Sequence, residues 1–143
     1  MKKRFRFLEH TADAYIEAYG SSLEEAFENA ALASTDVMTE ADKVEAQNEE
    51  NFVVEEPDEQ ALLYSWLEEL LLEFELKQKL YSRFEVSSIK ETGEGFRLHA
   101  RAWGEPYDQE RHPSKVGVKS VTYHRMEIVK NPESVTVRFI LDI

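Results

Sequence analysis

The chain has 143 residues, the size of one domain, and 42% of them are hydrophobic, which is enough for a substantial core. It has no cysteine, which excludes a disulfide framework, a zinc knuckle and a thiol nucleophile. The net charge of −12 and the lack of a long apolar run argue against tight nucleic-acid binding and membrane spanning, so we expect one soluble, cytoplasmic domain over residues 1–143.

The first two predicted strands, residues 4–8 and 14–19, are separated by His10-Thr11-Ala12-Asp13. Tight hairpin turns favour Asn-Gly or Asp-Gly, and neither pair occurs here. Two interpretations follow. The four residues form an ordinary turn in which His10 hydrogen-bonds a backbone group, or they form a site to which Asp13 contributes a carboxylate, and a histidine suits both.

The first predicted helix begins at Ser21-Ser22, where serine is followed three residues later by glutamate in a capping box, and runs to about Met38. Asp36 falls in its last turn and off its apolar stripe. The helix dipole disfavours an anion at that end. Positions that break a local rule are candidates for function, so Asp36 is the second candidate carboxylate.

An acidic segment spans residues 40–75, with 13 acidic side chains and one basic side chain, and it accounts for the whole net charge. It contains a predicted strand over residues 43–55 and a second helix, which we expect to start with Pro57 in its first turn. The acidic side chains are either a solvated face or a docking surface for a basic protein partner.

Four more strands are predicted over residues 81–90, 96–103, 116–129 and 134–141, with a long connection at residues 104–115. Because strands and helices do not alternate, the expected fold is α+β, a mostly antiparallel β-sheet or sheets with two α-helices packed on one side. In the last strand the period of two places Asp142 opposite the apolar face. In the strand over 116–129, Lys119 and His124 fall on opposite faces, and we expect His124 to be half-buried.

The sequence contains no nucleophile elbow, P-loop or Rossmann glycine pattern, so the carboxylates are the best chemical candidates. Carboxylates brought together repel one another unless a cation joins them, and a hard divalent ion would do so. The spacing of Asp13, Asp36 and Asp142 leaves open whether they meet. The alternative is a turn residue, a surface acid and an ordinary chain end.

Four stretches together resemble the archease family, in the family's order and over the whole chain: FLEHTADAYIEAYG, SLEEAFENAALASTDVMT, GVKSVTYHRMEI and RFILDI. The resemblance implies a protein cofactor, not an enzyme, of the GTP- and Mn-dependent RtcB-type RNA ligase of tRNA splicing. It implies that the protein promotes ligase guanylylation and multiple turnover. Two other functions stay open: a metal-dependent phosphate-ester hydrolase, and an acidic adaptor or chaperone.

The resemblance also assigns roles to individual residues. It implies that Asp13, Asp36 and Asp142 bind a divalent metal ion, with calcium expected and magnesium or manganese as alternatives. A terminal carboxylate or backbone oxygen of Ile143 would complete the site, and Lys119 would serve ligase activation. Two residues are expected to support the backbone around the first aspartate, His10 and Thr11.

Overall fold

The computed structural model describes residues 3–8 and 13–143. In this part of the chain, two antiparallel sheets have the strand orders β1-β2-β7-β6 and β3-β5-β4, which confirms the predicted α+β fold. The elements are β1 (Phe5–Leu8), β2 (Asp13–Gly20), α1 (Leu23–Met38), a 3₁₀ turn (Ala41–Lys43), β3 (Asn48–Glu56), α2 (Glu59–Lys77), β4 (Lys79–Glu91), β5 (Phe96–Pro106), β6 (Ser120–Asn131) and β7 (Ser134–Asp142).

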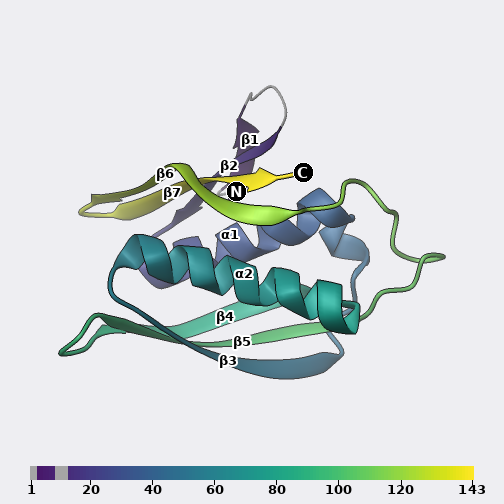
Figure 1. The fold of residues 1–143 in the computed structure, drawn as a ribbon, viewed down its shortest axis with the longest axis horizontal. Helices are drawn as coiled ribbons and strands as arrows, with labels where there is room; N and C mark the ends of the chain where they lie inside the picture. The colour runs from purple at the N-terminus through teal and green to yellow at the C-terminus, as the bar shows by residue number, and fades with distance from the viewer. Residues whose placement is uncertain (1–2, 9–12) are drawn as a thin grey trace.

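The two helices lie between the two sheets, so the molecule has three layers (Figure 1). Each sheet is covered by helices on one face, as predicted, and the second sheet closes the other side of the helix layer. The core fills both spaces between helices and sheets, and its largest fully buried side chains include Trp66, Phe27 and Phe139. No helix in the described part of the chain is long and apolar enough to cross a membrane.

Side chains cap the start of both helices. Ser22 accepts a hydrogen bond from the backbone N–H of Glu25 at 3.1 Å, in one of the two predicted capping-box registers. Asp58 caps α2 by accepting from the backbone N–H of Ala61 at 2.8 Å. Pro57 therefore precedes the cap, and its predicted place in the first turn of the helix is wrong because Asp58 supplies the capping oxygen.

Two strands begin later than the sequence predicts. The strand expected from residue 43 starts at Asn48, and the strand expected from residue 116 starts at Ser120. In both places the preceding residues pack at the end of α1 instead. The 3₁₀ turn follows that helix closely, and the backbone N–H of Lys115 donates to the carbonyl of Met38 at 3.1 Å. Helix-end carbonyls need partners, and Lys115 supplies one for Met38 in place of sheet pairing.

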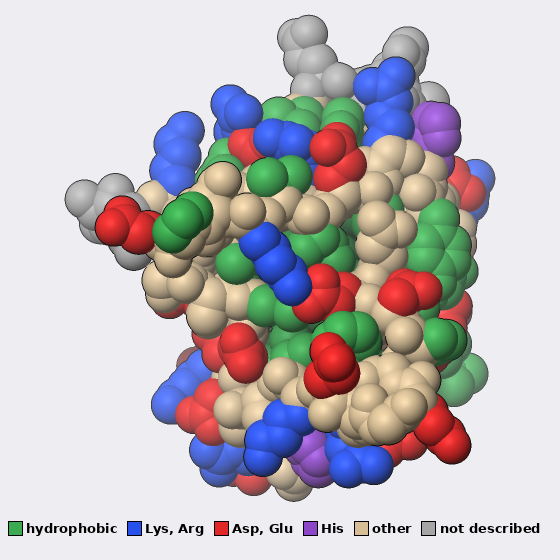
Figure 2. Space-filling model, turned by 90° about the vertical axis from the view of Figure 1, so that its left-hand side faces the viewer, with side chains coloured by type: hydrophobic (Ala, Val, Ile, Leu, Met, Phe, Trp, Pro, Cys, Tyr) green, Lys and Arg blue, Asp and Glu red, His purple; other side chains and the backbone are tan. Residues whose placement is uncertain are grey.

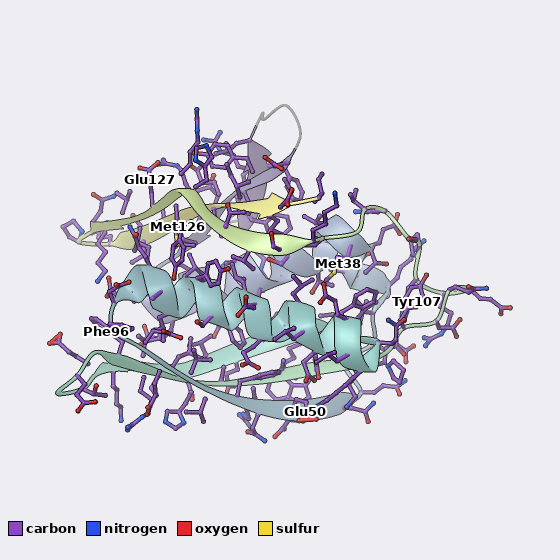
Figure 3. The ribbon with its side chains drawn as sticks, in the orientation of Figure 1. Met38, Glu50, Phe96, Tyr107, Met126 and Glu127 are labelled. Atoms are coloured by element: carbon purple, nitrogen blue, oxygen red, sulfur yellow. The ribbon has the colours of Figure 1, made fainter. Side chains whose placement is uncertain are left out.

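Strand β6 is interrupted in its middle. Its register with β7 breaks between Thr122 and Glu127, and Arg125 adopts a left-handed conformation with φ of 57°. His124 is exposed, so its predicted half-buried position is wrong, because the irregularity breaks the simple alternation of faces. Met126 then points toward α2 while Glu127 points away from it (Figure 3).

Candidate functional site

Strands β2, β6 and β7 come together at one end of their sheet. Asp142 of β7 is the register partner of Asp13 on one side and of Ser120 on the other. Residues directly opposite one another project from the same face of a sheet, while successive residues alternate. Leu141 is buried toward the helices with 2% exposure, so the three polar side chains project from the outer face.

Two carboxylates opposite each other favour a cation between them. Like charges directly opposite on neighbouring strands are destabilising, and carboxylate oxygens are the ligands that hard divalent ions prefer. Asp13 and Asp142 are both half-buried, and Ile143 with its backbone oxygen follows at once. The donors present therefore fit Ca²⁺, Mg²⁺ or Mn²⁺. Within residues 3–8 and 13–143, no group of three His, Asp or Glu side chains is arranged to hold a metal ion.

Asp36 lies in the last turn of α1, and its contacts there are with other residues. One carboxylate oxygen accepts from the backbone N–H of Ala41 at 3.1 Å, and the other lies 3.7 Å from Nζ of Lys115. The same Nζ donates to the backbone carbonyl of Asp36 at 2.9 Å. Lys115 thus places a cation at the negative end of the helix, which offsets the unfavourable position of this acid.

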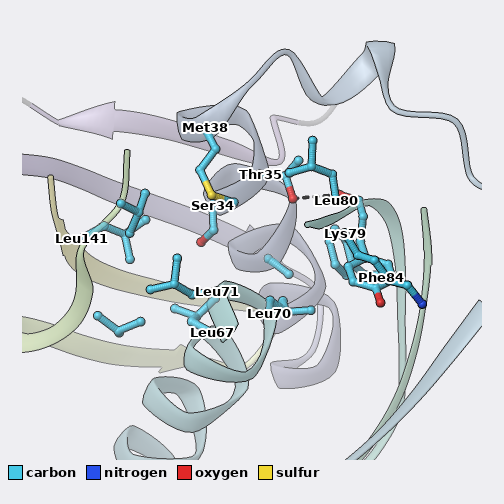
Figure 4. A pocket seen from close by; sticks show the side chains of 14 residues that line it. Ser34, Thr35, Met38, Leu67, Leu70, Leu71, Lys79, Leu80, Phe84 and Leu141 are labelled. Atoms are coloured by element: carbon cyan, nitrogen blue, oxygen red, sulfur yellow. Dashed lines mark hydrogen bonds between the residues drawn. The ribbon is translucent and has the colours of Figure 1, made fainter. Parts of the chain in front are cut away.

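The segment 115–119 connects this helix end with the end of β7. At one end it bonds to the Met38 carbonyl, and at the other the backbone N–H of Lys119 donates to the Asp142 carbonyl at 2.7 Å. Between these bonds Val118 lines a cavity that Met38 and Leu141 also line (Figure 4). The last turn of α1 and the end of β7 are therefore held on one wall of the molecule.

The predicted site residues do not all contact one another. Asp13 and Asp142 are register partners, Lys119 is tied to Asp142 through its backbone while its side chain is exposed, and Ile143 is half-buried. Asp36 belongs to the same wall, yet its carboxylate contacts Ala41 and Lys115. Two further predictions lie outside the described residues, those for His10 and Thr11.

A second polar row lies on the outer face of the same sheet, and no sequence pattern predicts it. Glu17 is 3% exposed and accepts from Nε of Arg6 at 2.6 Å, from Nε of Arg138 at 2.5 Å and from the hydroxyl of Tyr19. Burial raises the pKa of Glu17, but these hydrogen bonds outweigh it and lower the pKa to about 2. The strand register places Glu17 opposite both Arg6 and Arg138, and this pairing reveals the buried carboxylate.

The chain is similar to a known protein family and to several curated proteins. A model of the Archease protein family (MTH1598/TM1083) matches residues 5–143. A protein archease of Methanosarcina mazei is 38% identical over 141 residues, which cover 99% of this chain and 97% of that protein. A protein archease of Pyrococcus abyssi is 45% identical over 131 residues, which cover 92% of each chain.

Two solved structures are similar. The solution structure of Methanobacterium thermoautotrophicum protein 1598 has a TM-score of 0.82 and 40% identity, with 98% of this chain and 99% of that chain covered. A Thermotoga maritima crystal structure, described as an archease and possible chaperone, has a TM-score of 0.59 and 19% identity, covering 100% of this chain and 98% of that one. The second likeness concerns the fold alone.

Proposed function

This chain belongs to the archease family, and from that membership we propose that it is a protein cofactor of the RtcB-type RNA ligase of tRNA splicing. In this proposal the protein works in the cytoplasm, promotes guanylylation of the ligase and allows multiple turnover. It performs no catalysis of its own. The names of the relatives are consistent with this, because they describe a protein or a possible chaperone and no reaction.

The observation that carries the proposal is the alignment of Asp13 with Asp142 beside Lys119. Asp13, Asp142 and an oxygen of Ile143 would hold a divalent ion, and Asp36 is the fourth group that the resemblance assigns to it. Such an ion would neutralise the carboxylates and offer a positive centre to phosphate oxygens. The exposed ammonium group of Lys119 is a compact point charge suited to a phosphate.

Activation then follows from differential binding. A cofactor shifts the ligase toward its guanylylated or active state only if it binds that state more tightly than the other. We place this preferential binding at the end of the sheet that carries Asp13, Asp142 and Lys119. This end would bind at the metal and triphosphate pocket of the ligase, and more tightly in the active state. Its acidic groups and its lysine would match a pocket that holds both metal ions and phosphate groups.

The direct test is ligase guanylylation with GTP and Mn²⁺, with and without the purified protein. We expect faster guanylylation and more ligation events per ligase molecule. Phosphate release from phosphate esters by this protein alone would support the hydrolase alternative instead. Suppression of aggregation of an unrelated unfolded protein, with no effect on the ligase, would support a general chaperone.

A further inference from the structure

Helix α2 has one long side that neither sheet covers, and this side faces the viewer in Figure 1. Tyr64, Glu68, Leu72 and Leu76 recur at intervals of four residues along it. At 1.5 Å per residue this stripe is roughly 18 Å long. Leu72 is 38% exposed and Leu76 is 76% exposed, so two large apolar side chains on one helix face have no neighbouring element to cover them.

Carboxylates border this stripe. Glu68, Glu69 and Glu75 are exposed, and in the described part of the chain none of them forms a salt bridge. Some exposed acids elsewhere do form salt bridges. Glu55 pairs with Arg97 at 2.5 Å on the outer face of the smaller sheet.

The end of the molecule shown in Figure 2 has acidic and basic side chains interspersed. Lys130, near the end of β6, pairs with Glu59 at the start of α2 at 2.5 Å. The three exposed glutamates of α2 form a negative border around the exposed leucines, and Lys77, the one cation of this helix, pairs with Glu73 at 3.1 Å. Acidic side chains outnumber cations on the same side of α2 that leaves apolar side chains uncovered.

An aromatic pair lies at the start of the stripe. The rings of Tyr64 and Tyr123 stack with their centroids 4.4 Å apart and an interplanar angle of 11°, and Tyr123 is 54% exposed. Burial raises the pKa of Tyr123, and the nearby charges of Asp58 and Glu56 raise it further. An exposed aromatic face amid carboxylates is suited to a guanidinium or ammonium group.

We propose that this face of α2, defined by Tyr64, Glu68, Glu69, Leu72, Glu75 and Leu76 together with Tyr123, docks a basic amphipathic helix of a partner protein. The apolar side chains of that helix cover Leu72 and Leu76, and its Lys and Arg side chains meet the glutamates on either side and the tyrosine pair. RNA is a poor occupant because its phosphates are repelled by the same glutamates. The identification of this partner as the RNA ligase rests on the function proposed above.

The test separates binding to the ligase from activation of the ligase. Two variants alter the face, Leu72→Ser/Leu76→Ser and Glu68→Lys/Glu69→Lys, and both change exposed positions. Two matched controls alter exposed residues elsewhere, Val53→Ser on β3 and Glu94→Lys in the β4–β5 connection. Circular dichroism confirms that each variant is folded. Affinity for the purified RtcB-type ligase is measured by calorimetry at low and high salt, and multiple-turnover ligation is titrated with each variant.

We expect each face variant to raise the concentration for half-maximal activation at least tenfold while the maximal rate stays unchanged, and the controls to leave both unchanged. Unaltered affinity in both face variants overturns the docking inference and leaves the proposed function standing. Wild-type binding without activation, lost in the face variants, overturns the proposed function and leaves the docking standing. No wild-type binding, or tight binding of a labelled single-stranded RNA to this face, overturns the docking inference.

Discussion

Asp13 and Asp142 are direct register partners across β2 and β7, although they lie near opposite ends of the chain. The pairing places two half-buried acids side by side on the outer face of the sheet, with Ile143 one residue further on. Like charges directly opposite one another on neighbouring strands are destabilising unless a cation lies between them. The pairing therefore supports an ion site at this end of the sheet.

Binding of a divalent ion at this pair predicts a stabilisation that depends on Asp142. Calcium at a hundredfold excess over its dissociation constant should raise the free energy of unfolding by about 2.7 kcal/mol relative to EDTA. The variant Asp142→Asn should lose this response. In EDTA the free energy of unfolding of this variant should exceed that of the wild type by about 0.2–1 kcal/mol, because one of two opposed like charges is removed. Thermal unfolding with and without calcium measures both effects.

The control for the ion is Glu94→Gln, which changes an exposed carboxylate in the β4–β5 connection. It should keep the full calcium response of the wild type. An equal rise in melting temperature for Asp142→Asn and the wild type would show that the ion binds elsewhere. Repeating the titration with magnesium and manganese ranks the three candidate ions.

Lys115 is predicted to stabilise the end of α1 more than an ordinary surface lysine does. Lys115→Ala removes the hydrogen bond to the Asp36 carbonyl and a cation from the helix C-terminus, which should cost about 1 kcal/mol. The matched control is Lys43→Ala, which removes only an exposed pair with Glu40 and should cost clearly less. Urea unfolding compares the two, and equal losses would contradict the special role of Lys115.

Glu17 is predicted to make stability depend on acid pH. Its pKa of about 2 in the folded protein lies below its ordinary value of 4.5, so its contribution is complete above the ordinary value and is lost as the pH falls toward 2. The full contribution is about 3 kcal/mol by linkage. Glu17→Gln should therefore be destabilised at pH 7, and its difference from the wild type should shrink between pH 5 and pH 2.

The comparison with a second buried carboxylate makes this prediction specific. Glu105 is 3% exposed. Burial raises its pKa, but hydrogen bonds from Arg111, the Glu45 backbone and His112 outweigh this and lower it to about 2. Glu17→Gln should keep the part of the acid response that Glu105 supplies. A difference between Glu17→Gln and the wild type that stays constant from pH 7 to pH 2 would show that Glu17 does not titrate with a depressed pKa.

Local features of the fold could be predicted from the sequence because they depend on neighbouring residues. The Ser22 cap of α1, the alternation of β7 and the outward position of Asp142 all follow from short-range chemistry. The interruption of β6 could not be predicted, since the register with β7 sets it. Nor could the requirement for glycine at position 104, where an added Cβ would lie 1.8 Å from the Leu80 carbonyl oxygen across the β4–β5 pair.

In the candidate site, too, the sequence predicts the individual residues but not how the fold pairs them. Asp13, Asp36 and Asp142 could be predicted as candidates because each breaks a local rule, and Lys119 could be predicted from the resemblance to a family. The alignment of Asp13 with Asp142 required the strand order of the folded sheet. The pairing of Asp36 with Lys115 joins residues far apart in the sequence, and no local pattern marks that lysine.

The most direct test of the account is multiple-turnover ligation by the RtcB-type ligase with this protein and with its Asp13→Ala, Asp142→Ala and Lys119→Ala variants. Lys43→Ala serves as the control, and circular dichroism confirms folding. We expect many ligation events per ligase molecule with the wild type and the control, and a return toward a single turnover with each of the three variants. Full activation by all three folded variants would contradict it.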